Sequence, residues 1–96
     1  MHLSSAMTLR IATGSDGQRT TLRLSGRIRS TDIENIREAM KGKAEGIMLD
    51  LEEVTLVDLD VVRFLGLTEA EGVELVNCSP YIRDWIFREW NTEDRD

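Results

Sequence analysis

The sequence has few of the residues that would bring covalent or metal chemistry to a small domain. One cysteine, Cys78, excludes an internal disulfide framework and a zinc site built from several cysteines. The single histidine, His2, lies beside the N-terminus, and the chain has neither a phosphate-binding glycine loop nor a Ser/His/Asp set. These absences predict a protein that is not an enzyme, with no catalytic residues, no bound metal and no cofactor.

Long apolar runs and an excess of positive charge are also absent. No apolar run approaches the roughly 20 residues of a membrane-spanning helix, and the first seven residues lack a signal-peptide pattern. The formal net charge of −6 argues against non-specific binding to nucleic acid and against docking on anionic lipid. We therefore expect a cytoplasmic protein that contacts neither nucleic acid nor the membrane directly.

The composition that is present suits one globular domain. Hydrophobic residues make up 41% of the 96 residues and charged residues 31%, which is typical of a folded chain. The pattern predicts a flexible N-terminus over residues 1–6, a single domain over 7–90 and a flexible polar tail over 91–96.

Hydrophobic periodicity predicts four strands. Residues 7–13 and 20–28 alternate apolar and polar side chains around a glycine-containing turn, which indicates an antiparallel hairpin. Residues 47–51 are almost continuously apolar, which favours a central strand covered on both faces. Residues 73–76 predict a further short strand.

Three helices are expected over residues 32–41, 59–70 and from Pro80 to about residue 90. Thr31 and Glu34 match a capping box, and Ser79 before Pro80 is a strong start signal. The order β-β-α-β-α-β-α predicts an α/β fold with a mixed, mostly parallel four-stranded sheet.

The turn between the third strand and the second helix carries two acids, Asp58 and Asp60. Both lie where a helix start leaves backbone N–H groups unpaired, so capping and compensation of the helix dipole account for them. A recognition role in addition to capping stays open. Metal binding would need further oxygen ligands, such as Glu52 and Glu53 nearby, and no histidine beside the turn supports a metal site or supplies a catalytic base.

Four stretches resemble the STAS family, the small domain of bacterial anti-sigma factor antagonists. They are Leu22-Arg-Leu-Ser-Gly-Arg-Ile28, Gly46-Ile-Met-Leu-Asp-Leu51, Val54-Thr-Leu-Val-Asp58 and Gly72-Val-Glu-Leu-Val-Asn-Cys-Ser-Pro80. The family's signature turn is Asp-Ser-Ser/Thr-Gly, and a partner kinase phosphorylates its second hydroxyl. The matching residues here are Asp58, Leu59, Asp60 and Val61, so the phosphoacceptor position holds a carboxylate.

The resemblance implies a bacterial signalling module that binds a protein partner and regulates transcription. We expect the contact surface in residues 57–66, with Asp58, Leu59, Asp60, Val61, Val62 and Arg63 as the partner-binding residues. The partner would be an anti-sigma factor or kinase. Alternatives are an accessory STAS subunit of a membrane transport ATPase and a sensor of a small ligand or nucleotide.

Other side chains carry narrower expectations. Arg63 is expected to form a surface ion pair with an acid such as Glu53, or else to contact the partner. Cys78 is expected to be a buried, inert thiol. The last helix is rich in aromatic residues, and Tyr81, Phe87 and Trp90 predict a patch for a partner or for a homodimer, unless the tail or the first strand covers them.

Overall fold

The elements follow one another in the predicted order within the described residues, 9–42 and 46–94 of the computed structural model. The strands are β1 Arg10–Ser15, β2 Thr20–Ile28, β3 Ile47–Val57 and β4 Glu74–Val76, and the helices are α1 Ile33–Met40, α2 Leu59–Ala70 and α3 Pro80–Asp94. The sheet order is β1-β2-β3-β4, with β1 antiparallel to β2 and the other two pairs parallel. The predicted α/β class and mixed sheet are confirmed.

The turn of the predicted hairpin is built by Asp16. Its Oδ1 accepts hydrogen bonds from the N–H groups of Gln18 and Arg19 at 3.1 and 2.9 Å. Gly17 between them has a φ of +95°, a conformation that favours glycine. The first strand ends two residues later than predicted, at Ser15, and its predicted residues 7 and 8 lie outside the described residues.

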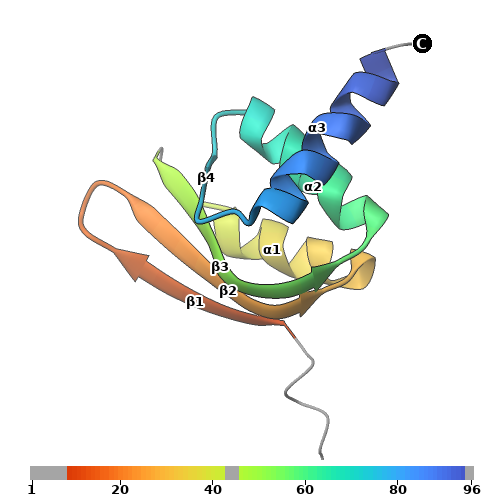
Figure 1. Cartoon of the computed structure of the whole chain (residues 1–96). Helices are drawn as coiled ribbons and strands as arrows, with labels where there is room; N and C mark the ends of the chain where they lie inside the picture. Colours follow the sequence, from red (N-terminus) through yellow and green to blue (C-terminus); the bar gives the residue numbers. More distant parts are fainter. Residues whose placement is uncertain (1–8, 43–45, 95–96) are drawn as a thin grey trace, which may run out of the picture.

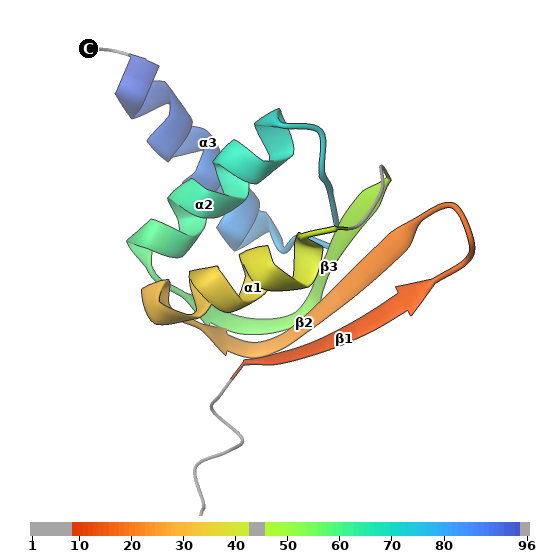
Figure 2. The same ribbon diagram turned by 180° about the vertical axis from the view of Figure 1, so that it is seen from behind.

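All three helices lie on one face of the sheet (Figures 1 and 2). Leu49 and Leu51 of β3 are buried beneath them, and Asp50 points to the opposite face by strand alternation. There the side chain of Asn77 donates a hydrogen bond to Asp50 at 3.1 Å, and Arg23 Nε lies 3.6 Å from the carboxylate. The prediction that β3 is covered on both faces is wrong, because its second face carries a carboxylate that needs polar partners.

The hydrophobic core lies between the sheet and the helices. Its buried side chains are Leu22, Leu24, Ile28, Ile36, Leu49, Leu51, Val57, Val61, Val62, Phe64, Leu65, Leu75, Ile82 and Ile86. The helix α2 contributes four of them from its inward side and also packs along α3. Its opposite side remains exposed, and this side is where the candidate site lies.

The start of α1 differs from the prediction. A 3₁₀ turn, Ser30–Asp32, precedes the helix, and the Asp32 carboxylate accepts a hydrogen bond from the Arg29 N–H at 2.9 Å. The capping box predicted for Thr31 and Glu34 does not form, since Asp32 is the N-cap of α1 and makes no side-chain cap bond there. The extra 3₁₀ turn shifts the helix start by one residue and so separates the two predicted partners from the cap position.

The helix α3 starts as predicted and ends later. The Ser79 hydroxyl accepts a hydrogen bond from the Ile82 N–H at 3.2 Å, and Pro80 occupies the first turn. The helix continues to Asp94, because residues 91–94 contain no glycine or proline to end it. The helix thus ends four residues later than predicted, and the flexibility of the tail stays a prediction. Residues 95–96 and the predicted flexible segment 1–6 lie outside the described residues.

Candidate functional site

Asp58 closes the turn between β3 and α2. It is the N-cap of α2, with extended backbone angles (φ −112°, ψ 179°), and its Oδ1 accepts a hydrogen bond from the Val61 N–H at 3.1 Å. Its backbone carbonyl accepts the first helical hydrogen bond, from the Val62 N–H at 3.0 Å. The predicted capping role of Asp58 is confirmed.

The second carboxylate oxygen of Asp58 is also occupied. Its Oδ2 accepts a hydrogen bond at 2.9 Å from the backbone N–H of Ser30, in the 3₁₀ turn that precedes α1. One carboxylate therefore joins the starts of α1 and α2, which come from separate parts of the chain. Asp58 is a structural residue that positions the turn, and its two oxygens are engaged within the domain.

Asp60 stands in contrast to Asp58. It is exposed in the first turn of α2, where the helix dipole stabilises a negative charge. Within residues 9–42 and 46–94, no side chain or backbone group forms a hydrogen bond or ion pair with its carboxylate. Asp58 performs the capping, whereas Asp60 only compensates the helix dipole, so both of its carboxylate oxygens stay open to a partner.

The outer face of α2 contains only part of the predicted contact set. Leu59, Asp60 and Arg63 are exposed, whereas Val61 and Val62 are 0% exposed and belong to the core. Consecutive residues of a helix do not share a face, so a continuous run of positions necessarily includes inward ones. The prediction that Val61 and Val62 contact a partner is therefore wrong for this fold.

Leu67 belongs to the same face and was missed by sequence analysis. It follows Leu59 and Arg63 at intervals of four residues, which places the three side chains one above another on the helix. The side chain is 52% exposed although it is apolar. The available signal was the spacing of four residues, which places Leu67 on the same side of the predicted helix as Leu59 and Arg63. We define the α2 outer face as Leu59, Asp60, Arg63 and Leu67.

Ion pairs between α2 and α3 border this face. Arg63 Nε lies 3.2 Å from Glu89 Oε1, so the expected surface ion pair is confirmed, but its acid is Glu89 rather than Glu53. Glu53 accepts a hydrogen bond from Ser25 of β2 instead. Two hydrogen bonds, at 2.8 and 3.1 Å, join Arg83 to Glu69 further along the helices. These pairs fix the directions of the charged groups, although an exposed pair contributes less than about 1 kcal/mol to stability.

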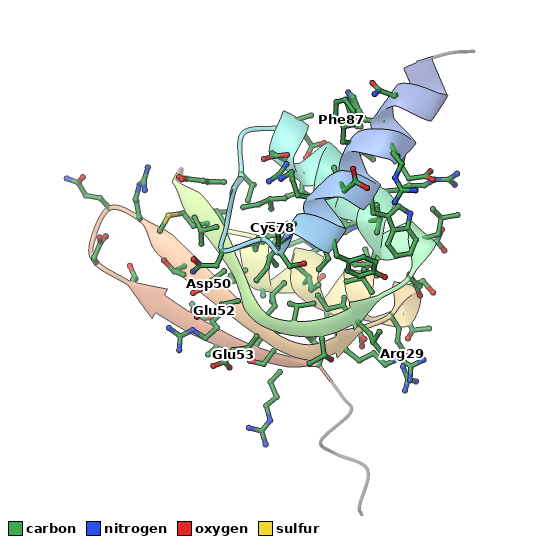
Figure 3. The ribbon with its side chains drawn as sticks, viewed as in Figure 1. Arg29, Asp50, Glu52, Glu53, Cys78 and Phe87 are labelled. Carbon is green, nitrogen blue, oxygen red and sulfur yellow. The ribbon has the colours of Figure 1, made fainter. Side chains whose placement is uncertain are left out.

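The aromatic residues of α3 fall into two groups. Phe87 and Trp90 are 62% and 44% exposed and line the same groove beside α2. Tyr81 is exposed on the other flank of the helix, where it packs against Trp85 with ring centroids 5.8 Å apart. Figure 3 shows Phe87 on the helical layer, away from the sheet. The single patch predicted for Tyr81, Phe87 and Trp90 is thus divided.

The groove between α2 and α3 arises where the two helices approach closely at Gly66. A Cβ atom on Gly66 would lie 3.4 Å from both the Ile86 side chain and the Trp90 ring. The groove has a volume of about 300 Å³, and its lining residues are Gly66, Glu69, Ala70, Arg83, Ile86, Phe87 and Trp90. The Trp90 ring and the Ile86 side chain thus lie close to Gly66, with room for about one additional methyl group at contact distance.

Cys78 lies in the connection between β4 and α3 and is partly buried. Burial raises the pKa of its thiol above the ordinary value of 9.0, and the nearby Arg83 opposes this shift only in part. The thiol is therefore neutral at physiological pH, as expected for an inert cysteine, although its burial is incomplete.

In the part of the chain that the structure describes, His, Cys, Asp and Glu side chains nowhere gather in groups of three or more that could hold a metal ion. Of the helices in the same residues, none is both long enough and apolar enough to cross a membrane.

Comparison with known proteins shows a structural relationship. Neither protein-family models nor curated protein sequences match this chain. Among solved structures, it is similar to an anti-sigma-factor antagonist STAS domain from Rhodobacter sphaeroides, with a TM-score of 0.50 and 16% identity. The match covers 76% of this chain and 86% of that domain. The chain therefore has a STAS-like fold, as the sequence resemblance predicted.

Proposed function

We propose that this chain is a STAS-like regulatory module that binds a protein partner through the α2 outer face. The observation that carries the proposal is the carboxylate of Asp60, which is exposed at a helix start while Asp58 performs the capping. The similarity to a domain described as an anti-sigma-factor antagonist supports a partner of the anti-sigma factor class.

The chemistry of this face favours partner binding that does not depend on phosphorylation. Asp60 stands at the position that matches the family's phosphorylated hydroxyl, and its charge needs no kinase. A carboxylate offers about one negative charge and two oxygens, against roughly −1.5 to −2 and three oxygens for a phosphate. We therefore expect a partner to read Asp60 as a weaker and permanent equivalent of the phosphorylated state.

The remaining side chains of the face supply affinity and orientation. Leu59 and Leu67 offer exposed apolar surface on either side of Arg63, whose guanidinium is held by Glu89. Apolar contacts flanked by oriented charges are a common composition for a transient protein interface. A partner would therefore present apolar side chains together with a basic group opposite Asp60.

Isothermal titration calorimetry with an anti-sigma factor from the same cell tests the proposal. We expect Asp60→Asn to weaken binding roughly fivefold to tenfold, because it removes the charge that the partner reads. Glu34→Gln is the matched control, since Glu34 is an exposed acid in the first turn of α1. Equal effects of the two substitutions, or no effect of either, would contradict the proposal.

Intact mass spectrometry after incubation with an anti-sigma kinase and ATP tests the fixed charge separately. The wild-type chain should gain no phosphate between residues 55 and 65, where Thr55 is the only hydroxyl. The variant Asp60→Ser restores a hydroxyl at the matching position and serves as the positive control. Phosphate on Thr55 of the wild type would show that this turn is still switched by a kinase.

A further inference from the structure

The positive charge of this acidic chain is concentrated in one part of the sheet. Residues 9–29 contain five arginines and one acid, whereas the whole chain has a formal net charge of −6. Three of these arginines, Arg10, Arg27 and Arg29, form neither an ion pair nor a ring contact with the described residues. Every other arginine or lysine side chain in residues 9–42 and 46–94 has an acid or an aromatic ring as its partner.

The strand register brings the three unpaired arginines to one end of the open face of the sheet. Arg10 lies diagonally across from Arg27 in the pairing of β1 with β2, at roughly 7–8 Å. On its other side Arg27 lies opposite Leu56 of β3. Ile28 points into the core, so the extended backbone of Arg29 returns its side chain to the open face. We define the arginine patch as Arg10, Arg27, Arg29 and Leu56.

The acids that border the patch are held by other groups. The Glu53 carboxylate accepts a hydrogen bond from the Ser25 hydroxyl at 3.3 Å, and the Asp32 carboxylate accepts one from the backbone N–H of Arg29 at 2.9 Å. Figure 3 shows Glu53 well apart from Arg29 along the sheet. The guanidinium groups of the patch are therefore open to carboxylates from outside the domain.

The composition of the patch fits an acidic protein segment better than it fits other polyanions. A guanidinium binds a carboxylate through two parallel hydrogen bonds, and arginine is enriched in protein interfaces. Leu56 is 46% exposed beside Arg27 and offers an apolar contact that a phosphate backbone would not use. The net charge of −6 repels an extended polyanion such as nucleic acid or an anionic membrane, whereas a short acidic segment meets mainly the arginines.

We propose that the arginine patch binds an acidic segment of a second protein partner. Carboxylates of the segment bind the guanidinium groups, and an apolar side chain between them packs on Leu56. The α2 outer face calls for a basic group opposite Asp60, so the two surfaces select partner segments of opposite charge. The proposal uses no residue of the α2 outer face, and it therefore stands or fails separately from the proposed function.

Isothermal titration calorimetry of the whole chain with a synthetic peptide of the repeat Glu-Asp-Leu tests the patch. We expect Arg27→Gln combined with Arg29→Gln to weaken binding roughly tenfold or more, because two carboxylate contacts are lost. Arg88→Gln is the matched control, since it removes the charge of an exposed arginine of α3, on the helical side of the sheet. Its effect should stay below about twofold.

Two further variants separate charge from geometry and from apolar contact. Arg27→Lys combined with Arg29→Lys keeps the charge but loses the forked donors, so it should weaken binding less than glutamine does. Leu56→Ser should weaken binding roughly threefold to fivefold. All of these side chains lie at the surface, so the thermal unfolding transition measured by circular dichroism should be preserved. A peptide with Gln and Asn in place of its acids should not bind.

NMR mapping with the same peptide locates the contact independently of the variants. The amide signals of Arg10, Arg27, Arg29 and Leu56 should shift, and those of the α2 outer face should not. Absence of peptide binding, shifts confined to α2, or equal losses from Arg88→Gln and the glutamine double variant would overturn the proposal. Tighter binding of a single-stranded oligonucleotide or of phosphatidylglycerol vesicles than of the peptide would also overturn it, by assigning the patch to a different class of partner.

Discussion

The carboxylate of Asp58 joins two helix starts, and its removal should therefore cost more than the loss of an ordinary cap. Asp58→Ala deletes the acceptor of the Val61 N–H and, in the same step, the acceptor of the Ser30 N–H. Loss of an N-cap costs about 0.5–2 kcal/mol. The bond to Ser30 is exposed, so water partly replaces it and its loss adds about 0.5–1.5 kcal/mol. The expected decrease in the free energy of unfolding is therefore about 1–3.5 kcal/mol.

Two further substitutions separate these contributions. Asp58→Asn keeps an oxygen for the Val61 N–H but turns an NH₂ group toward the Ser30 N–H, so it should lose about half of the effect. Asp60→Ala removes no hydrogen bond to the described residues and should cost at most about 0.3–1 kcal/mol through the helix dipole.

Urea unfolding monitored by circular dichroism measures these differences. The midpoint should fall in the order wild type, Asp58→Asn, Asp58→Ala, with an unchanged dependence on urea concentration. The thermal midpoint should fall by about 4–8 °C for each kcal/mol in a domain of this size. A loss below about 0.5 kcal/mol for Asp58→Ala, or an equal loss for Asp60→Ala, would refute the assignment of both oxygens.

Three further predictions follow from single side chains. Gly66→Ala should be neutral or should stabilise the domain by up to about 1 kcal/mol in thermal unfolding. Alanine favours a helix more than glycine does, and its Cβ would make ordinary contact with Trp90 at 3.4 Å. Marked destabilisation would show that α2 and α3 cannot accommodate the added methyl group. The hydrogen bond from Asn77 lowers the pKa of Asp50 below 3.8, so its charged form stabilises the fold above that pH. This stability should disappear as the pH falls through the lowered pKa, and Asp50→Asn should flatten the acid limb of stability against pH; an unchanged limb would contradict the assignment. Cys78 should react with iodoacetamide more slowly in the folded chain than in urea, because burial raises its pKa; equal rates would contradict this.

Local signals in the sequence predicted the start of a helix correctly where the residues of one short segment determine it. Ser79 and Pro80 mark the start of α3, and Asp58 marks the start of α2, because a cap forms between residues only three positions apart. The same logic failed at α1, where Thr31 and Glu34 match a capping box. The bond from the Arg29 N–H to Asp32 forms instead and makes an additional 3₁₀ turn.

Hydrogen bonds and ion pairs between distant segments of the chain could not be predicted from the spacing of residues in the sequence. The link from Asp58 to Ser30 and the pair of Arg63 with Glu89 connect residues 28 and 26 positions apart. Figure 3 places Asp50 on the sheet, and its hydrogen bond from Asn77 likewise joins β3 to a residue 27 positions later, just after β4. The sequence pattern suggested which side chains face inward, but the partners on the surface depend on how the helices pack.

The most direct test of the account is NMR mapping of the partner surface. Titration of the ¹⁵N-labelled chain with an anti-sigma factor should shift amide signals of Leu59, Asp60, Arg63 and Leu67, together with their helical neighbours. The open face of the sheet, represented by Arg23 and Glu53, should remain unchanged and serves as the internal control. Shifts confined to the sheet, or saturating binding that leaves α2 unperturbed, would contradict the claim that the α2 outer face is the recognition surface.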